Sequence, residues 1–361
     1  MTDHTQTLLR RQATRTLAIA ASLALAATLA GCAGTTETAT TAVAADAATP
    51  VEDGAYPTTI SHAFGEAVIE EEPERIVTIG ISSEDTVLAL GLVPVAVPDE
   101  TWAGDEDGYL PWFRDAVEAL DVPLPETLNV SDTGELDFEQ ILDLEPDIIL
   151  APYSGITETD YDRLNSIATT VAYAGEAWGI TSWQDQATII GQALGRPAQT
   201  ATLIEEAETA ISDAAAAHPE FGGTTFAYGM ALAEGSTELA FYDKKDGRVT
   251  FTEQLGLTMS LEVAEISANR PADAWYGGVS LEKLDTVSPD VFIAWGDDQA
   301  QVDASLANPL LAEWAPIAAG SDVWITDREL ARATTSVSIL SMDWALERYV
   351  PLLADAAAAA G

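Results

Sequence analysis

The chain repeats one pattern of residues, and this repeat limits its architecture more than any other feature. Residues 136–151 (LDFEQILDLEPDIILA) align without a gap with residues 279–294 (VSLEKLDTVSPDVFIA), 143 positions later, and the alignment pairs Glu139 with Glu282. Each copy predicts a short helix, a Pro-Asp turn and a buried strand. A looser match pairs residues 90–92 with 255–257, in the same order. Two ordered matches indicate two similar α/β lobes.

A long helix is predicted between the two copies. Pro197 suits a first helical turn, residues 198–217 contain neither Gly nor Pro, and His218 and Pro219 end the pattern. Helix composition alone favours an ordinary crossover helix in one large α/β domain. The repeat favours a first lobe over 58–196, a linking helix over 197–218 and a second lobe over 219–361. Strands that alternate with helices at these lengths predict parallel sheets in both lobes.

The elements expected within the lobes follow from local patterns. A hairpin is predicted over 58–70 around Gly65. Runs of β-branched and apolar residues predict further strands, and helical spacing ended by Gly or Pro predicts helices. The strands are expected at 75–80, 93–97, 148–151, 170–173, 225–231, 291–294 and 323–326, and the helices at 86–90, 161–167, 251–255 and 338–353.

The amino terminus is typical of an export signal. Arg10, Arg11 and Arg15 precede an apolar stretch over 17–29 that is too short to span a membrane comfortably. Residues 29–32 (LAGC) resemble a bacterial lipobox, which implies cleavage before Cys32 and lipidation of its thiol, and with it a palmitate-type anchor. We therefore expect a signal peptide over 1–31, a flexible tether over 32–57, and a mature protein held on the outer face of the cytoplasmic membrane.

Composition excludes several classes of function. The net charge of −44 disfavours binding to nucleic acid or to anionic lipid headgroups. One cysteine and three histidines leave little material for a Cys-rich or His-based metal site or for a Ser-His-Asp triad. Phosphate-binding glycine motifs and a nucleophile elbow are missing from the sequence. These observations favour a binding protein over an enzyme, with no resident metal or cofactor.

Candidate ligand-binding residues lie where strands are expected to end. In parallel sheets, ligands bind in loops beyond the carboxyl ends of the strands. Those loops are rich in aromatic rings and arginine, which suit a large, flat, oxygen-rich ligand in a cleft between the lobes, although any one aromatic could instead serve packing. The candidates are Trp102, Trp112, Arg114, Tyr153, Tyr242, Arg270, Trp275, Trp295 and Arg332.

The order of short motifs resembles the iron-siderophore and cobalamin class of substrate-binding lipoproteins of ABC transporters. The resemblance runs from about residue 61 to 353, and each piece alone is weakly specific. It rests on His62–Gly65, Pro73–Val77, Ala89–Val95, Pro146–Ile149, Leu164–Val171, Ile190–Gly195 and Ser338–Ser341.

This resemblance implies two Rossmann-like lobes joined by one long helix, with the ligand between them. It also implies that Glu139 and Glu282 dock onto arginines of a membrane permease; without it, both would be ordinary solvated helix residues. The expected function is capture of a ferric siderophore by a monomeric, membrane-anchored receptor. Cobalamin or haem remains an alternative ligand, haem with Tyr153 or Tyr242 as its axial group, and an exported enzyme acting on a metal chelate is a less favoured alternative.

The charge of the ligand stays open at this level. Arg114, Arg270 and Arg332 would suit an anionic iron complex, whereas the acidity of the rest of the chain allows a neutral or cationic hydroxamate complex equally well.

Overall fold

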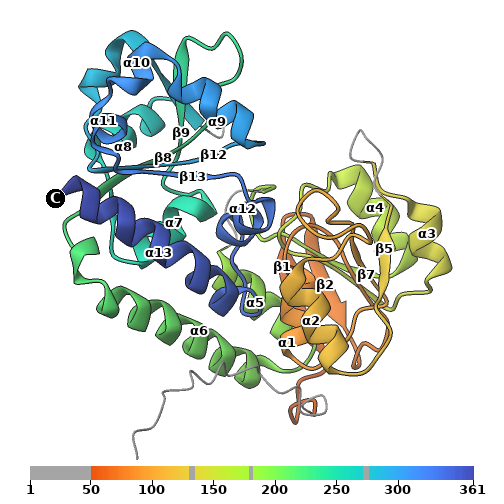
Figure 1. Cartoon of the computed structure of the whole chain (residues 1–361). Helices are drawn as coiled ribbons and strands as arrows, with labels where there is room; N and C mark the ends of the chain where they lie inside the picture. Colours follow the sequence, from red (N-terminus) through yellow and green to blue (C-terminus); the bar gives the residue numbers. More distant parts are fainter. Residues whose placement is uncertain (1–49, 130–134, 179–181, 271–275) are drawn as a thin grey trace, which may run out of the picture. The chain divides into compact units, whose positions relative to one another are not determined.

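The computed structural model describes residues 50–361 except 130–134, 179–181 and 271–275. This part of the chain is a mixed α/β protein with a two-stranded, a five-stranded and a six-stranded sheet (Figure 1). The predicted hairpin forms from β1 (Thr58–His62) and β2 (Gly65–Ile69), which pair in antiparallel. The predicted leader and Cys32 lie outside the described residues, and no described helix is long and apolar enough to cross a membrane.

The first lobe is built on the five-stranded sheet. Its strand order is β5-β4-β3-β6-β7, and all of its pairs are parallel, as predicted. Every residue of β6 is buried, which explains why this strand is an unbroken apolar run. The strands are β3 (Ile76–Thr78), β4 (Ala96–Pro98), β5 (Glu126–Leu128), β6 (Ile148–Ala151) and β7 (Thr169–Ala172); the helices are α1 (Ser83–Ala89), α2 (Pro111–Ala119), α3 (Phe138–Asp143), α4 (Glu158–Ile167) and α5 (Trp183–Ala193).

The second lobe is built on the six-stranded sheet, ordered β11-β9-β8-β12-β13 with β10 also beside β8. Its strands are β8 (Thr225–Met230), β9 (Glu238–Tyr242), β10 (Thr258–Met259), β11 (Tyr276–Ser280), β12 (Val291–Trp295) and β13 (Asp322–Ile325). The pairs of β8 with β10 and β12, and of β12 with β13, are parallel, as predicted. Strands β9 and β11 add two antiparallel pairs. Only residues 231–237 join β8 to β9, and this connection is too short for a parallel crossover.

Helices and 3₁₀ turns complete the second lobe. The turn η2 lies directly before β12, as α3 lies before β6 in the first lobe. The helices are α7 (Gly247–Gln254), α8 (Leu261–Ala268), α9 (Gln299–Leu306), α10 (Pro309–Ala312), α11 (Ala315–Ala319), α12 (Arg328–Thr335) and α13 (Met342–Ala360), and the turns are η1 (Pro219–Phe221) and η2 (Leu281–Thr286).

The two copies of the repeat occupy equivalent places in the two sheets. In the first lobe, Asp147 accepts hydrogen bonds from the backbone amides that lead into β3, including that of Arg75 at 3.0 Å. In the second lobe, Asp290 accepts one from the amide of Thr225, the first residue of β8, at 2.7 Å. Each carboxylate therefore ties the start of one central strand to the turn before its parallel neighbour.

The looser match also has a structural meaning. Gly91 follows the end of α1 and Gly256 follows the end of α7, with φ of 79° and 106°. A residue just past a helix end commonly adopts this left-handed conformation, which glycine reaches without steric cost. In each lobe, the repeated residues therefore provide an aspartate that binds the start of a central strand and a glycine that follows the end of a helix.

The long linking helix is α6, which spans Pro197–Ala217 with Pro197 in its first turn. It packs on α5 of the first lobe and on α13 of the second (Figure 1). The contact with α5 needs a glycine, because a Cβ at Gly191 would lie 2.0 Å from the Thr200 hydroxyl oxygen. This residue choice lets the two helices approach closely.

The C-terminal helix differs from its expected bounds. The prediction placed a helix over 338–353, whereas α13 begins at Met342 and continues through Pro351 to Ala360. Ser338 and Ser341 form a turn first, since each backbone amide donates to the other's hydroxyl oxygen at 2.9 and 3.0 Å. Serine side chains that bond the backbone in this way compete with the helix and delay its start.

Candidate functional site

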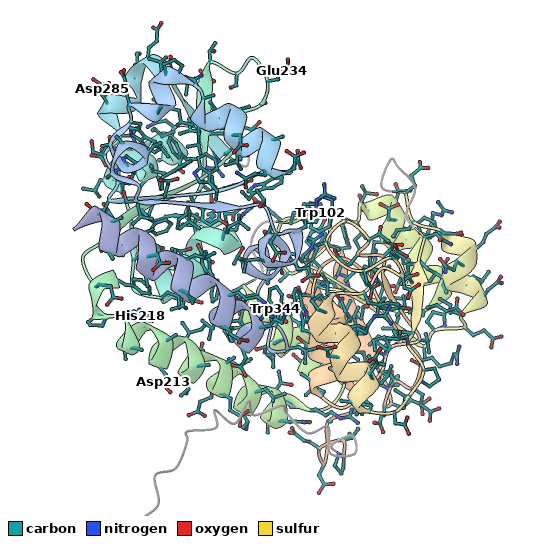
Figure 2. All side chains as sticks on the ribbon, in the orientation of Figure 1. Trp102, Asp213, His218, Glu234, Asp285 and Trp344 are labelled. Atoms are coloured by element: carbon teal, nitrogen blue, oxygen red, sulfur yellow. The ribbon has the colours of Figure 1, made fainter. Side chains whose placement is uncertain are left out.

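Two tryptophans from different lobes meet where strands of both sheets end. Trp102 lies in the loop after β4, and Trp295 is the last residue of β12. Their rings pack edge to face, with centroids 6.2 Å apart, and Trp102 remains 40% exposed beside helix α12 (Figure 2). An exposed aromatic face at the carboxyl ends of strands is available to a ligand.

Arginines surround this aromatic pair. The guanidinium of Arg332 on α12 lies 5.3 Å from the centroid of the Trp102 ring, and its Nη2 is 2.8 Å from Oε2 of Glu100. Burial raises the pKa of Glu100, and Arg332 opposes that rise. A cavity of about 240 Å³ opens here, lined by Trp102, Tyr228, Arg248, Trp295, Ala331, Arg332 and Thr335.

Tyr242 supports the cavity from behind. Its hydroxyl accepts a hydrogen bond of 2.7 Å from the Trp295 indole nitrogen, which fixes the orientation of that ring. The Arg248 guanidinium lies 3.6 Å from the Tyr242 ring centroid and donates two hydrogen bonds of 2.8 Å to Asp246. Burial raises the pKa of Tyr242, so this phenol stays neutral at physiological pH.

A second cavity, of about 470 Å³, takes residues from both lobes. Tyr153, after β6, packs edge to face against Trp178, with ring centroids 6.0 Å apart. Nη2 of Arg270 lies 2.5 Å from Oδ2 of Asp243. Gly155 makes room for Trp178, because a Cβ there would meet the indole nitrogen at 1.9 Å. Burial raises the pKa of Tyr153. The lining also includes Glu176, Gln186, Lys244, Lys245, Phe251 and Ser336.

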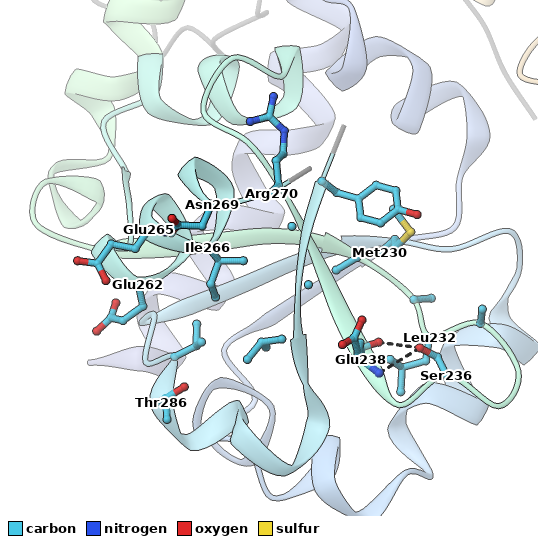
Figure 3. Close-up of a pocket in the computed structure, with 18 residues that line it drawn as sticks. Met230, Leu232, Ser236, Glu238, Glu262, Glu265, Ile266, Asn269, Arg270 and Thr286 are labelled. Carbon is cyan, nitrogen blue, oxygen red and sulfur yellow. Dashed lines mark hydrogen bonds between the residues drawn. The ribbon is translucent and has the colours of Figure 1, made fainter. Parts of the chain in front are cut away.

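A larger cavity, of about 1200 Å³, lies within the second lobe between β9, β11 and α8 (Figure 3). Glu238, Glu262 and Glu265 line it, and Arg270 is the one predicted site residue in its described lining. The described lining of this cavity comes from the second lobe alone, so a ligand held between the lobes would not fill it. We therefore assign the candidate site to the two cavities that both lobes form.

The other predicted site residues lie elsewhere. Trp112 is 5% exposed and packs against Trp344 with ring centroids 5.1 Å apart, so it serves packing. Arg114 pairs with Asp105 and with Asp107, the latter at 2.9 Å. Neither residue is in the described linings of the three cavities. Trp275 lies outside the described residues.

Among the lining residues that the sequence did not predict are a tyrosine and an arginine of the smaller cavity, Tyr228 and Arg248. Tyr228 is in the middle of buried strand β8, and its apolar sequence neighbours predict a core aromatic residue there. Arg248 is in the first turn of α7, and Asp246 two positions earlier caps that helix. The Asp-Gly-Arg order at a helix start after a strand was the available signal for Arg248.

The lobes also meet at a fully buried polar contact. Oδ2 of Asp85 on α1 accepts hydrogen bonds from the indole nitrogen of Trp112 at 3.0 Å and from the Ser338 hydroxyl at 2.6 Å. Nearby, the Ser82 hydroxyl donates to the Ser336 carbonyl at 3.0 Å. Burial raises the pKa of Asp85 to about 7 and that of Glu84 well above its usual range.

The two predicted docking residues occupy matching exposed positions. Glu139 is the second residue of α3, and Glu282 is the second residue of η2. Both side chains face solvent, each in the short helix that precedes a Pro-Asp turn. The repeat therefore presents one exposed carboxylate from each lobe in the same local setting.

Comparison with known proteins agrees with this architecture. Residues 76–320 match the model of the periplasmic binding protein family. The chain belongs to this family. The Fe(3+)-citrate-binding protein YfmC of Bacillus subtilis is 25% identical over 279 residues, which cover 75% of this chain and 81% of YfmC. The probable siderophore-binding lipoprotein YfiY of the same organism is 26% identical over 253 residues, which cover 69% and 73%.

A solved structure is closer still in sequence. PiaA of Streptococcus pneumoniae TIGR4, determined in complex with ferrichrome, is 32% identical, with a TM-score of 0.74. The match covers 84% of this chain and 99% of PiaA. The two-lobe fold predicted from the repeat is therefore confirmed.

Proposed function

We propose that the protein is the extracytoplasmic binding component of an ABC importer and that it captures a ferric siderophore for iron uptake. The observation that carries the proposal is the meeting of Trp102 and Trp295, from different lobes, over a cavity flanked by Arg248 and Arg332. Aromatic faces and guanidinium groups suit a bulky chelate rich in oxygen. Two similar proteins support the same ligand class. YfiY is described as a probable siderophore-binding lipoprotein, and PiaA was determined in complex with ferrichrome.

A chelated ferric ion explains why no protein ligands are needed. Among the described residues there is no cluster of three or more His, Cys, Asp or Glu side chains that could hold a metal. A siderophore already fills the coordination sphere of iron, so the protein supplies stacking surfaces and hydrogen-bond donors instead. Trp102, Trp295, Arg332, Tyr228 and Arg248 would contact the ligand in the smaller cavity, and Tyr153 and Arg270 in the larger; Tyr242 orients Trp295.

Intrinsic fluorescence tests this function directly. The chain has nine tryptophans, and Trp102 and Trp178 lie at the two cavities. We expect saturable quenching at submicromolar concentration by one class of ferric siderophore. Tight binding of cobalamin or haem, with no response to siderophores, would replace the ligand but keep the receptor role. Chemical turnover of a bound chelate would instead support an enzyme.

We infer that the receptor is held at the membrane by a lipid on Cys32, after removal of residues 1–31. The residues that follow Cys32 would then form a tether that lets a monomer reach its permease. A Cys32→Ala variant should lose incorporation of a labelled fatty acid and appear in the medium or periplasm. Retention of the variant on membranes would contradict the anchor.

Docking on the permease is assigned to Glu139 and Glu282. Exposed carboxylates at matching positions of two lobes suit arginines on a membrane permease. Glu139→Ala and Glu282→Ala should reduce uptake while ligand affinity stays unchanged. Glu158→Ala is a matched control, because Glu158 is an exposed residue in the first turn of α4. Equal uptake by all three variants would contradict the docking role.

A further inference from the structure

Each arginine that lines the two interlobe cavities has a carboxylate partner. Arg270 lies 2.5 Å from Asp243, and Arg332 lies 2.8 Å from Glu100. Arg248 binds the carboxylate at position 246 through two hydrogen bonds of 2.8 Å. The described linings therefore contain three guanidinium groups, and all three are neutralised within the protein.

The partners are well shielded from water. The carboxylate side chains at 243, 246 and 100 are 11%, 14% and 7% exposed, and the arginine side chains are between 15% and 26% exposed. Charges at short range in a poorly solvated site interact strongly, so each pair presents a dipole to a ligand and not a net positive charge. Nε of Arg332 has no hydrogen-bond partner among the described residues, so this guanidinium can still donate to a neutral oxygen acceptor.

Other charges near the cavities are exposed. Lys244, Lys245 and Glu176 are exposed residues of the larger lining, and Arg328 approaches Trp102 from outside the described lining of the smaller one. Water and salt screen such charges strongly. The chain as a whole carries a net charge of −44, which repels anions at long range.

We infer that the cleft selects iron complexes without net charge, of the ferric trishydroxamate class, over anionic complexes; this rests on the proposed function. Three hydroxamate groups, each with one negative charge, neutralise Fe³⁺. Three catecholate groups carry two negative charges each and leave the complex strongly anionic. An anionic complex would face Asp243 and Glu100 together with their arginines. Lys244 and Lys245 of the larger lining are exposed, so water and salt screen them and they offset little of its desolvation.

Asp243 and Glu100 are thereby the specificity-determining residues. Asp243→Asn keeps the acceptor for the amide of Lys245 but removes the charge that neutralises Arg270. Glu100→Gln likewise removes the charge that neutralises Arg332. Each change leaves a cation facing the ligand, so each should shift preference toward anionic complexes by about tenfold. Asp246 is less suitable, because it also caps α7.

The test measures affinity for ferrichrome, a neutral trishydroxamate, and for ferric enterobactin, an anionic triscatecholate, by calorimetry on the purified protein. We expect ferrichrome to bind at least about a hundredfold more tightly, and we expect each variant to reduce this ratio by about tenfold. Glu72→Gln is the matched control: Glu72 pairs with Arg196 at 2.8 Å beside the start of α6, outside the described cavity linings, so the ratio should not change. Circular dichroism verifies that each variant is folded.

The possible failures are distinguishable. If neither iron complex binds the wild-type protein, the proposed function fails. If enterobactin binds as tightly as ferrichrome, or if the ratio is the same in Asp243→Asn, Glu100→Gln and Glu72→Gln, the receptor role stands and charge selection by these pairs is overturned.

Discussion

Two of the places where the lobes meet differ in chemistry. At the aromatic contact, Trp102 and Trp295 leave an open cavity, and Arg332 is neutralised by Glu100. At the buried polar contact, Asp85 receives two hydrogen bonds, and its Oδ1 has no partner among the described residues. The first contact keeps surfaces free and compensates its charges. The second leaves no free surface and holds a carboxyl group without a cation beside it.

This difference indicates that the aromatic contact binds the ligand, whereas the buried polar contact holds the two lobes together. A buried carboxylate without a counterion is costly, and the cost is removed when the group is protonated. Protonation of Asp85 at Oδ1 leaves Oδ2 free to accept from Trp112 and Ser338. We therefore expect the buried contact to respond to pH through stability, and the aromatic contact to respond to ligand.

The largest expected effect is that of Asp85→Asn on stability. The pKa of Asp85 is raised from 3.8 to about 7, so the folded state holds this proton more tightly than the unfolded chain does. The stabilisation is complete below pH 3.8 and is lost as pH rises through 7, which destabilises the wild type on the order of 4 kcal/mol at alkaline pH. The amide stays neutral and keeps the acceptor. Urea unfolding at pH 5 and pH 8 should show the variant gaining relative stability at pH 8.

Other groups face Asp85, and they define the control. Glu84, whose pKa is also raised by burial, and Glu100 lie near it, so only the difference between variant and wild type reports on Asp85. Asp105 behaves oppositely: burial acts to raise its pKa, but hydrogen bonds from Arg114 and backbone amides lower it overall. Asp105→Asn should therefore lose stability at pH 8 relative to acid. Parallel pH curves for Asp85→Asn and wild type would contradict the prediction.

The next effect concerns the aromatic contact. Trp102→Ala should weaken siderophore binding by about tenfold to a hundredfold, because an aromatic face that stacks on a ligand contributes roughly 1–3 kcal/mol. The melting temperature should change little, since the Trp102 side chain is 40% exposed. Trp102→Phe retains a ring and should recover most of the affinity, as measured by calorimetry. If Trp102→Ala greatly lowered the melting temperature but left siderophore affinity unchanged, the aromatic contact would serve stability and not ligand binding.

The sequence predicted the scaffold better than the site. The Pro-Asp turns and the glycines at helix ends are local signals, and both recur in the two lobes, so Asp147, Asp290, Gly91 and Gly256 identified equivalent elements. The antiparallel strand β9 was not separately expected, because the pairing of a strand depends on the length of its connection and on neighbours distant in sequence.

Site residues depend on contacts that no local pattern reveals. Trp102, Trp295 and Arg332 were selected by position and residue type, and they line one cavity. Trp112 had the same type and a similar position, yet its indole is directed to Asp85 in the interior. The partner of Arg332 could not be inferred from the sequence either, because Glu100 is 232 positions away and the acidic residues are too numerous for pairing to be inferred.

The smallest effect tests how the buried contact is held. Ser82 has φ of 59°, a left-handed conformation that is unfavourable for residues with a Cβ, and its hydroxyl bonds the Ser336 carbonyl. Ser82→Ala removes the hydrogen bond but keeps the Cβ, so unfolding free energy should fall by about 1 kcal/mol. Ser82→Gly also removes the hydrogen bond but relieves the backbone, so its loss should be smaller. If glycine is as destabilising as alanine in urea unfolding, the backbone at Ser82 carries no strain, and the hydroxyl alone accounts for the contribution of this residue to the buried contact.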